Sequence, residues 1–454
     1  MNYLDESSSR QKMKPLVSIV NYKNLSSVAR AIELCNGFKY LTPTCRVLLK
    51  PNICGAFKEG GVPPFGAVTT TRVIEGTVRA LKDFGVNDIS IGEGSVLDEF
   101  GTNTSRAYKC INIHKLAKFY GVKLIDFNAG PHKRMTVEDV TMNIAVAALD
   151  TDFFINLPVL KTHHHTMVSL AGKNLKGCMS IASKKFFHGK NSILHYRISR
   201  LIETVPQHLV IIDGIYAMEH GPDPTVGTAH ARGILVASTY FLAADSVGTR
   251  LLGGNPNAVE HLKLYAERHR KLDVLKNQQA IEIRGEPVED HIQYLAWETN
   301  LEQDIKTSGH TGLEVKLIND TLCCGCYGNL TGSLLFLAAL SRNKEFHGLR
   351  IVAGKSLKDD RNSPRTFLFG DCAIKENKHL DKATTVRGCP PKFFRTCSLL
   401  VNQMPGLSGK VAFYGRAFLA LVRALMGIGY FPLPRYEKYK SDPSYDIEYF
   451  TFSK

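Results

Sequence analysis

Residues 69–95, TTTRVIEGTVRALKDFGVNDISIGEGS, combine an amphipathic helical pattern with a short apolar run that ends in glycines. Threonine is a common residue at the start of a helix, and an apolar run of this length is typical of a buried strand. A chain in which strands alternate with helices forms a mainly parallel sheet with helices on both faces. The stretch therefore predicts an α/β fold.

Short apolar runs bounded by Gly, Pro, Asn or Asp recur on both sides of this stretch. They are PLVSIVNY, RVLLKPNI, DISIGEGS, VKLIDFNAG, DFFINLPVL, HLVIIDGI and GILVAS. A second, smaller α/β unit begins at Leu313 with the order strand, helix, strand, strand. We expect an N-terminal α/β domain over 1–275, a connecting region over 276–310, a C-terminal α/β domain carrying cysteines over 311–400, and a tail with an amphipathic helix over 401–454.

The composition is that of a globular protein, with 44% hydrophobic and 22% charged residues in a chain of 454. The first residues, MNYLDESSSRQKMKP, lack the apolar core of a signal peptide, so the expected location is the cytoplasm. The net charge of +15 favours an anionic metabolite or an acidic partner protein, although a generally basic surface would give the same value. No segment has the pattern of a nucleic-acid-binding module, so we expect no such partner.

Polar residues follow several of the predicted strands. In a parallel α/β sheet the strands end at one edge, where loops and helix starts build binding sites. The candidate anion-binding residues at this edge are Lys50, Asn52, Thr69, Thr70, Gly92, Glu93 and Gly94. Turn glycines and a threonine helix cap would explain several of them without any ligand.

The segment LPVLKTHHHTMVSLAGKNLKG, residues 157–177, has the densest set of lysines and histidines after a strand. A lysine and a histidine there could bind a carboxylate or phosphate, or transfer a proton. The candidate catalytic residues are Lys161, His163 and Lys173. A solvated basic loop is the competing interpretation.

Four cysteines are expected to meet in the C-terminal domain. Cys323 and Cys326 are three residues apart at a predicted helix start, and Cys372 and Cys389 each end an extended run. Four thiolates suit an iron–sulfur cluster or zinc, and the absence of a second close cysteine pair favours a 4Fe–4S cluster. Cys324 should face away from the site, and Cys397 should lie in the core.

The chain resembles the uncharacterised iron–sulfur family called domain of unknown function 362. The resemblance is carried by LLKPNI, IGEGS, INLPVLKTHHHTMVSLAGKNLKGC and AADSVG, and it covers most of residues 45–400. The ferredoxin-type segment that many members carry is missing from this sequence. A fainter similarity links the chain to the nickel-pincer lactate racemase superfamily, with Lys161, His163 and Lys173 at matching places. That similarity implies proton chemistry by lysine and histidine, with Lys173 as a place for cofactor attachment.

Three functions are compatible with these patterns. The first is a redox or lyase-type enzyme that acts on an anionic metabolite and holds a 4Fe–4S cluster in its C-terminal domain. The second is a non-catalytic electron-transfer or cluster-carrier protein that docks an acidic redox partner. The third is a racemase-like enzyme in which the cluster has a structural role.

The tail contains an apolar stretch, VAFYGRAFLALVRALMGIGYF, over residues 411–431. A helix spanning a membrane would bury Arg416 and Arg423 at a cost of several kcal/mol, so a span is not expected. The remaining interpretations are a helix docked on the protein and a helix at a membrane surface. We expect docking, with peripheral membrane contact at most.

Overall fold

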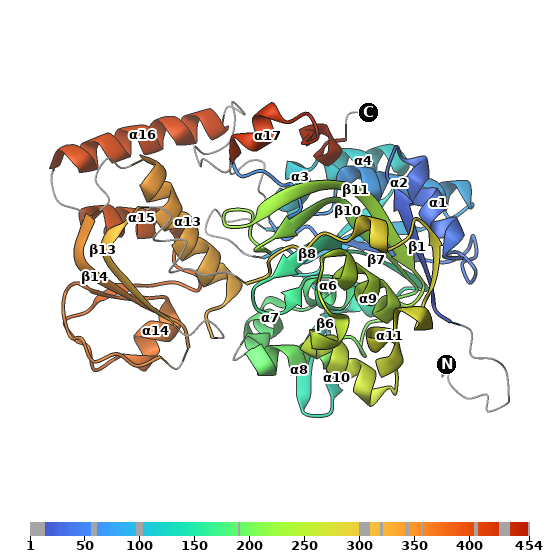
Figure 1. The fold of residues 1–454 in the computed structure, drawn as a ribbon, viewed down its shortest axis with the longest axis horizontal. Helices are drawn as coiled ribbons and strands as arrows, with labels where there is room; N and C mark the ends of the chain where they lie inside the picture. Colours follow the sequence, from blue (N-terminus) through green and yellow to red (C-terminus); the bar gives the residue numbers. More distant parts are fainter. Residues whose placement is uncertain are drawn as a thin grey trace.

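The structure is a computed structural model that describes residues 14–55, 61–96, 103–188, 191–298, 309–317, 321–340, 345–355, 357–403, 407–425 and 436–452. Within these ranges the chain forms a large sheet with helices on both faces and a smaller four-stranded sheet (Figure 1). The predicted α/β class is confirmed.

The large sheet is mainly parallel, as predicted. Its main path has the strand order β12-β1-β11-β10-β7-β2-β3-β4, while β8 pairs with β10 and β9 pairs with β8. The strands are β1 (Leu16–Asn21), β2 (Val47–Pro51), β3 (Ile89–Glu93), β4 (Lys123–Asp126), β7 (Phe153–Leu157), β8 (Val159–His163), β9 (Met167–Val168), β10 (Leu209–Glu219), β11 (Thr228–Ser238) and β12 (Glu282–Gly285). Parallel pairing brings the ends of β2, β3 and β7 to one edge, where the lysine and asparagine residues considered below are placed.

Each face of this sheet is covered by its own hydrophobic core. In β2 the side chains alternate, with Leu48 in one core and Leu49 in the other, as the two-residue repeat of a strand requires. Helices on the Leu49 side are α1 (Ser26–Leu34), α2 (Thr71–Asp83), α3 (Thr104–Cys110) and α4 (Ile113–Tyr120). Those on the Leu48 side include α6 (Ala171–Asn174), α7 (Ile181–Phe187), α8 (Asn191–Leu201), α9 (Phe241–Leu251), α10 (Glu260–Arg268) and α11 (Leu272–Lys276).

Three features of the large domain differ from a simple α/β alternation. β10 and β11 are antiparallel neighbours, and β11 also pairs antiparallel with β1. The hairpin of β5 (His132–Val137) and β6 (Val140–Ala145) stands outside the large sheet. β12 pairs with β1, so the segment 276–310, which we expected only to connect two domains, supplies a strand to the first one.

The C-terminal unit has the element order that the sequence predicts. Its parallel strands, in spatial order, are β13 (Thr311–Leu317), β14 (Glu345–Ala353), β15 (Thr366–Phe369) and β16 (Thr384–Val386). Its helices are α13 (Cys324–Leu340), α14 (Asp371–Glu376) and α15 (Phe393–Asn402). A separate apolar core lies among β13–β15, α13 and α15, and it includes the predicted core cysteine Cys397, which is 2% exposed.

Helix α13 lies between the two sheets (Figure 1). The ring of Tyr327 stacks on His164 of the large domain, with ring centroids 4.6 Å apart. Gly328 is so close to Asp223 that a Cβ on this glycine would lie 1.9 Å from the Asp223 carboxylate. The helix that starts at the cysteine motif is therefore also packed against the large domain.

The tail divides into two parts that pack in different places. Helix α16 (Leu407–Leu425) docks on the C-terminal unit, where Arg416 donates a hydrogen bond of 3.1 Å to the Leu340 carbonyl at the end of α13. Residues 436–452 instead return to the large domain, where the Tyr439 and Phe450 rings pack against Phe65. Taken over the described ranges, the chain has no helix that is both long and apolar enough to cross a membrane.

Candidate functional site

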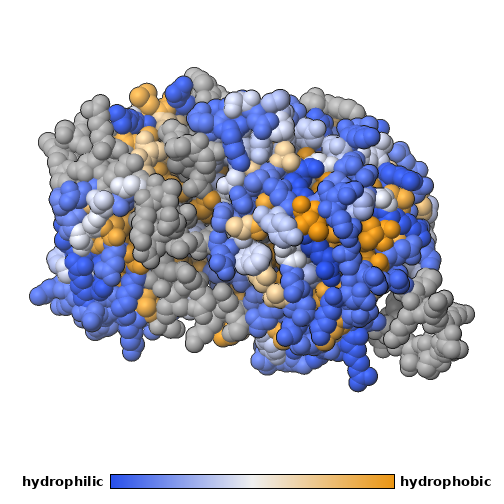
Figure 2. Space-filling view, in the orientation of Figure 1, coloured by the Kyte–Doolittle hydropathy of each residue, from blue (hydrophilic) through white to orange (hydrophobic). Residues whose placement is uncertain are grey.

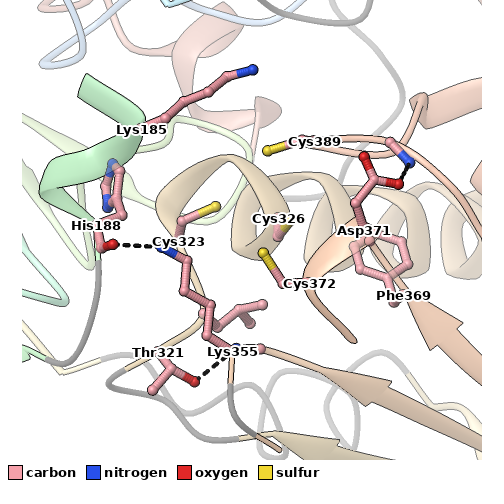
Figure 3. A pocket seen from close by; sticks show the side chains of 14 residues that line it. Lys185, His188, Thr321, Cys323, Cys326, Lys355, Phe369, Asp371, Cys372 and Cys389 are labelled. Atoms are coloured by element: carbon pink, nitrogen blue, oxygen red, sulfur yellow. Dashed lines mark hydrogen bonds between the residues drawn. The ribbon is translucent and has the colours of Figure 1, made fainter. Parts of the chain in front are cut away.

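The four cysteines predicted to form a site line one pocket of the C-terminal unit (Figure 3). Cys323 directly precedes α13, and Cys326 lies in its first turn. Cys372 is the second residue of α14, just after β15, and Cys389 follows β16. In Figure 3 the four sulfur atoms point toward a shared space. Parallel pairing of β15 with β16 explains why cysteines far apart in the sequence reach the same edge.

The backbone conformation of Gly370 helps to place these thiols. Gly370 has φ of +88° between β15 and α14, and a Cβ on it would lie 3.4 Å from the Cys326 sulfur and 3.6 Å from the Gly388 carbonyl oxygen. Glycine adopts this backbone conformation without the steric penalty that other residues meet. The sequence FLFGDC thus turns sharply and places Cys372 in the pocket.

The thiols influence one another strongly. A hydrogen bond with Cys323 raises the pKa of Cys326 well above its usual range, and burial and the neighbouring cysteine charges act in the same direction. Burial also raises the pKa of Cys372, and the positive charge of Lys355 opposes that shift. A group of thiols in this environment gives up its protons readily only when positive charge is supplied beside it.

Basic residues from both domains complete the pocket. Lys185 and His188 come from the end of α7 in the large domain, and Lys355 follows β14 in the C-terminal unit. Lys355 donates a hydrogen bond to the His188 carbonyl oxygen, and its backbone N–H donates to the Thr321 hydroxyl at 3.1 Å. The cysteine pocket, defined here by the four cysteines with Lys185, His188 and Lys355, therefore lies where the two domains meet.

Among the residues that the structure describes, no three His, Cys, Asp or Glu side chains are arranged to hold one metal ion. The four cysteines share the lining of one pocket. The Cys324 side chain lies outside the described part of the structure.

A second group of polar side chains lies at the end of β2, β3 and β8 in the large domain. Lys50 and Glu93 form an ion pair of 2.8 Å, and their side chains are 0% and 4% exposed. Lys50 also donates to the Pro51 carbonyl oxygen at 2.8 Å and to the Asn174 amide oxygen at 3.3 Å. These three acceptors use all three Lys50 protons, so this lysine has no donor left for a ligand.

Two further lysines approach this ion pair. Lys161, 1% exposed, donates to the Asn52 amide oxygen at 3.1 Å and to the Ala67 carbonyl oxygen at 2.6 Å. Lys184, partly buried on α7, donates to the Gly94 carbonyl oxygen at 2.6 Å and to the Asn128 amide oxygen at 2.8 Å. Each contacts neutral acceptors, and in the described ranges neither forms an ion pair with a carboxylate.

Burial lowers the pKa of Lys161, with the Cys54 and Glu93 charges opposing that shift, and burial lowers the pKa of Lys184 to about 8. The lysine cluster, defined here as Lys50, Lys161 and Lys184 with Glu93, Asn52 and Asn174, thus contains three lysines and one carboxylate. Each of its two unpaired lysines has one proton beyond those used in the hydrogen bonds above.

The other residues expected at this edge have structural partners. The Thr69 hydroxyl accepts from the Asn52 N–H and donates to the Leu157 carbonyl, at 2.8 and 2.7 Å. Thr70 caps α2 as predicted, and its hydroxyl donates to Asp213 at 2.8 Å. The hydrogen bonds of Thr69 and Thr70 hold the loop before α2 in place and give no sign of a ligand.

The two glycines of the GEG turn are explained by close packing. A Cβ on Gly92 would lie 2.2 Å from the Phe127 ring, and one on Gly94 would lie 2.5 Å from the Lys184 ammonium. Gly94 therefore leaves room for the lysine that the sequence analysis did not single out.

Lys161, His163 and Lys173 have different neighbours in the described part of the structure, and their joint catalytic role stays a prediction. His163 is fully buried, and its Nδ1 accepts from the His165 N–H at 3.0 Å. The positive charge of Lys173 acts on two other histidines, His195 and His261. It helps to lower their pKa values, for which burial is the main cause. The structure thus places Lys161 in the lysine cluster and Lys173 beside the buried histidines.

Several site residues were not among the sequence candidates, namely Lys184, Asn174, Lys185, His188 and Lys355. Lys184 and Lys185 occur in SIASKKFF, where Ser180 caps α7. The helix cap followed by two lysines was the sequence signal that could have indicated these residues. The sequence does not show that the two consecutive lysines point toward different sites.

Fold and site together define an α/β protein with a lysine cluster in its larger domain and a four-cysteine pocket at the domain boundary. Residues 47–250 match the family model of Domain of unknown function (DUF362), which confirms the family resemblance seen in the sequence. The matched range contains the lysine cluster and ends before the four cysteines of the pocket.

A curated protein and a solved structure are also similar to this chain. The thylakoid-associated protein sll1697 of Synechocystis sp. is 26% identical over 242 residues, which cover 52% of this chain and 72% of that protein. The lactate racemase apoprotein of Thermoanaerobacterium thermosaccharolyticum aligns over 85% of this chain and 86% of its own, with 11% identity and a TM-score of 0.36.

Proposed function

We propose that this protein is an iron–sulfur oxidoreductase that binds an anionic metabolite in its larger domain. Cys323, Cys326, Cys372 and Cys389 would hold a 4Fe–4S cluster. The observation that carries the proposal is the direction of four sulfur atoms toward one pocket (Figure 3).

The donor set fits a cluster better than it fits zinc. A zinc ion takes all its ligands at one point, whereas each iron of a 4Fe–4S cluster takes one cysteine. Four thiols from separate segments that line one pocket are compatible with the second geometry, and the sequence lacks the second close cysteine pair that is typical of zinc ribbons. Lys185 and Lys355 would balance part of the negative charge of the four thiolates.

Four cysteine ligands favour electron transfer over lyase chemistry. When bound, such a cluster supplies one-electron transfer, and a Lewis-acidic iron is available only where a cluster corner lacks a protein ligand. The four cysteines would supply one thiolate for each of the four irons. We therefore favour the redox alternative.

The lysine cluster favours an enzyme over a pure electron carrier. Buried charges are normally paired, and Lys161 and Lys184 have only neutral acceptors in the described structure. A carboxylate or phosphate of a substrate would complete their hydrogen bonds. Because its pKa is about 8, Lys184 could also hold or release a proton near neutral pH.

One helix connects the two proposed sites. Lys184 of α7 contacts the lysine cluster, while its neighbour Lys185 lines the cysteine pocket. A substrate bound beside Lys184 would thus contact the residue next in sequence to Lys185, which lines the cysteine pocket. This arrangement suits electron exchange between a bound anion and the C-terminal unit.

Anaerobic purification followed by iron, sulfide and zinc analysis tests the cluster. We expect iron and sulfide in equal amounts, with the broad visible absorbance of a cluster. Changing Cys323, Cys326, Cys372 or Cys389 to Ala should abolish that absorbance, and Cys397→Ala, a change in the apolar core, should leave it. Stoichiometric zinc in a colourless protein would contradict the cluster.

A carrier without catalytic activity is the alternative. It predicts the same absorbance and no binding of small anions. Calorimetry with inorganic phosphate and simple carboxylates therefore separates the two functions, because only the enzyme needs a ligand at Lys161 and Lys184.

A further inference from the structure

Helix α16 is attached to the C-terminal unit by one of its faces. Phe413 is 2% exposed, and its ring centroid lies 6.0 Å from that of Phe336 on α13. Ala417 and Ala420 pack against the same core, and Arg416 is bound to the end of α13. These contacts attach α16 to the C-terminal unit through one face only.

That other face is also apolar. Tyr414, Phe418 and Leu419 are 45%, 66% and 61% exposed. Figure 2 shows a small hydrophobic group at the upper left of the molecule, where Figure 1 places α16. Large apolar residues that gather on a surface mark an interaction site more often than single exposed ones do.

The patch extends to the neighbouring helix. The Tyr414 hydroxyl is 3.0 Å from the Ser398 hydroxyl of α15. Phe394, 39% exposed, is one turn before Ser398 and so lies on the same side of α15. The α15–α16 patch is defined here as Phe394, Tyr414, Phe418 and Leu419.

The sequence around the patch is strongly basic. Residues 382–436 contain no Asp or Glu and eight Lys or Arg residues, namely Lys382, Arg387, Lys392, Arg395, Lys410, Arg416, Arg423 and Arg435. Segments of this charge are attracted to anionic lipid headgroups, and exposed aromatic and aliphatic side chains enter the boundary between headgroups and acyl chains. Pairing of two copies through this patch would instead bring two basic segments together, which like-charge repulsion opposes.

We propose that the α15–α16 patch attaches this protein to the surface of an anionic membrane. α16 lies along the membrane plane, with Phe418 and Leu419 inserted at the headgroup boundary. Arg423, exposed one turn after Leu419, contacts lipid phosphates. The opposite face, with Phe413, stays on the C-terminal unit, so binding needs no refolding of the helix.

Sedimentation of the full-length protein with lipid vesicles tests this proposal. The protein should sediment with vesicles of phosphatidylcholine mixed with phosphatidylglycerol, and much less with phosphatidylcholine alone. High salt should weaken the binding, because part of the attraction is electrostatic. The double variant Phe418→Ser/Leu419→Ser should lose affinity at least about tenfold.

Tyr40→Ser is the matched control, because Tyr40 is 68% exposed but lies in the large domain. It should bind vesicles as the unchanged protein does, and circular dichroism should be the same for all variants. The proposal is overturned if the unchanged protein ignores the anionic vesicles. It is also overturned if the double variant changes only a monomer–dimer equilibrium or the retention on nucleic acid.

Discussion

The Lys50 ammonium and the Glu93 carboxylate pair at 2.8 Å in the interior of the large domain. Glu93 also accepts from the backbone N–H groups of Ile53 and Gly94, at 2.9 and 2.8 Å. The pair thus joins the ends of β2 and β3. It holds the loops of the lysine cluster in place, so the anion binding proposed above is assigned to Lys161 and Lys184.

Lys50→Met should therefore act mainly on stability. It leaves the buried Glu93 charge without its partner, and such changes cost about 3–5 kcal/mol of unfolding free energy. Urea denaturation measures the loss. The double variant Lys50→Met/Glu93→Gln removes both charges of the pair, so part of the stability should return. An equal loss in the single and double variants would contradict the buried pair.

Lys161→Met and Lys184→Met should weaken anion binding. Each removes a charge-assisted hydrogen bond worth about 1.5–3 kcal/mol, which corresponds to roughly tenfold or more in affinity. Calorimetry with inorganic phosphate checks this, with Lys173→Met as control because Lys173 lies beside His195 and His261. Equal losses in all three variants would place the anion elsewhere.

Binding of the anion should also depend on pH. Lys184 has a pKa of about 8, so it is charged below that value and neutral above it. Phosphate affinity should therefore fall as the pH rises through 8, and the bound anion should shift the transition upward because it favours the charged lysine. In Lys184→Met this part of the pH dependence should be absent.

The His164–Tyr327 stack joins the large domain to α13. Aromatic pairs of this kind contribute about 0.5–1.5 kcal/mol beyond the area that they bury. A double-mutant cycle with His164→Ala and Tyr327→Ala should give a coupling free energy of that size in urea denaturation. Additive effects of the two changes would mean that the rings do not stabilise the domain contact.

Much of this architecture follows from local patterns in the sequence. The runs RVLLKPNI and DISIGEGS became β2 and β3 because short apolar runs between turn residues suit a buried parallel sheet. The cysteine set could be placed at one edge because strand ends share an edge in such a sheet. Periodicity did not reveal that β10 and β11 are antiparallel, since a fully buried run looks the same in either direction.

The partners of individual side chains could not be read from the sequence. Lys50 and Glu93 are 43 residues apart, and only the register of β2 against β3 brings them together. Lys161 and Lys173 occur in one motif, yet the chain from β8 to α6 turns between them and gives them different neighbours. Residues 436–452 reach the large domain through tertiary packing of tyrosine and phenylalanine rings, which no local pattern encodes.

Lys355 provides a test of the proposed cluster that does not remove a ligand. The positive charge of Lys355 opposes the rise in the pKa of the Cys372 thiol, so Lys355 acts electrostatically on this cysteine. A reduced cluster carries one more negative charge than an oxidised cluster, so a nearby lysine stabilises the reduced form. Lys355→Met should therefore make the reduction potential more negative while the iron and sulfide content stays the same.

Protein-film voltammetry of the anaerobic protein measures this potential. Lys358→Met is the matched control, because Lys358 is exposed, three residues further along the chain, and does not line the cysteine pocket. A potential that shifts equally in both variants would reflect only the overall charge of the protein. An unchanged potential in Lys355→Met would show that the redox centre lies away from Lys355, and hence outside the cysteine pocket.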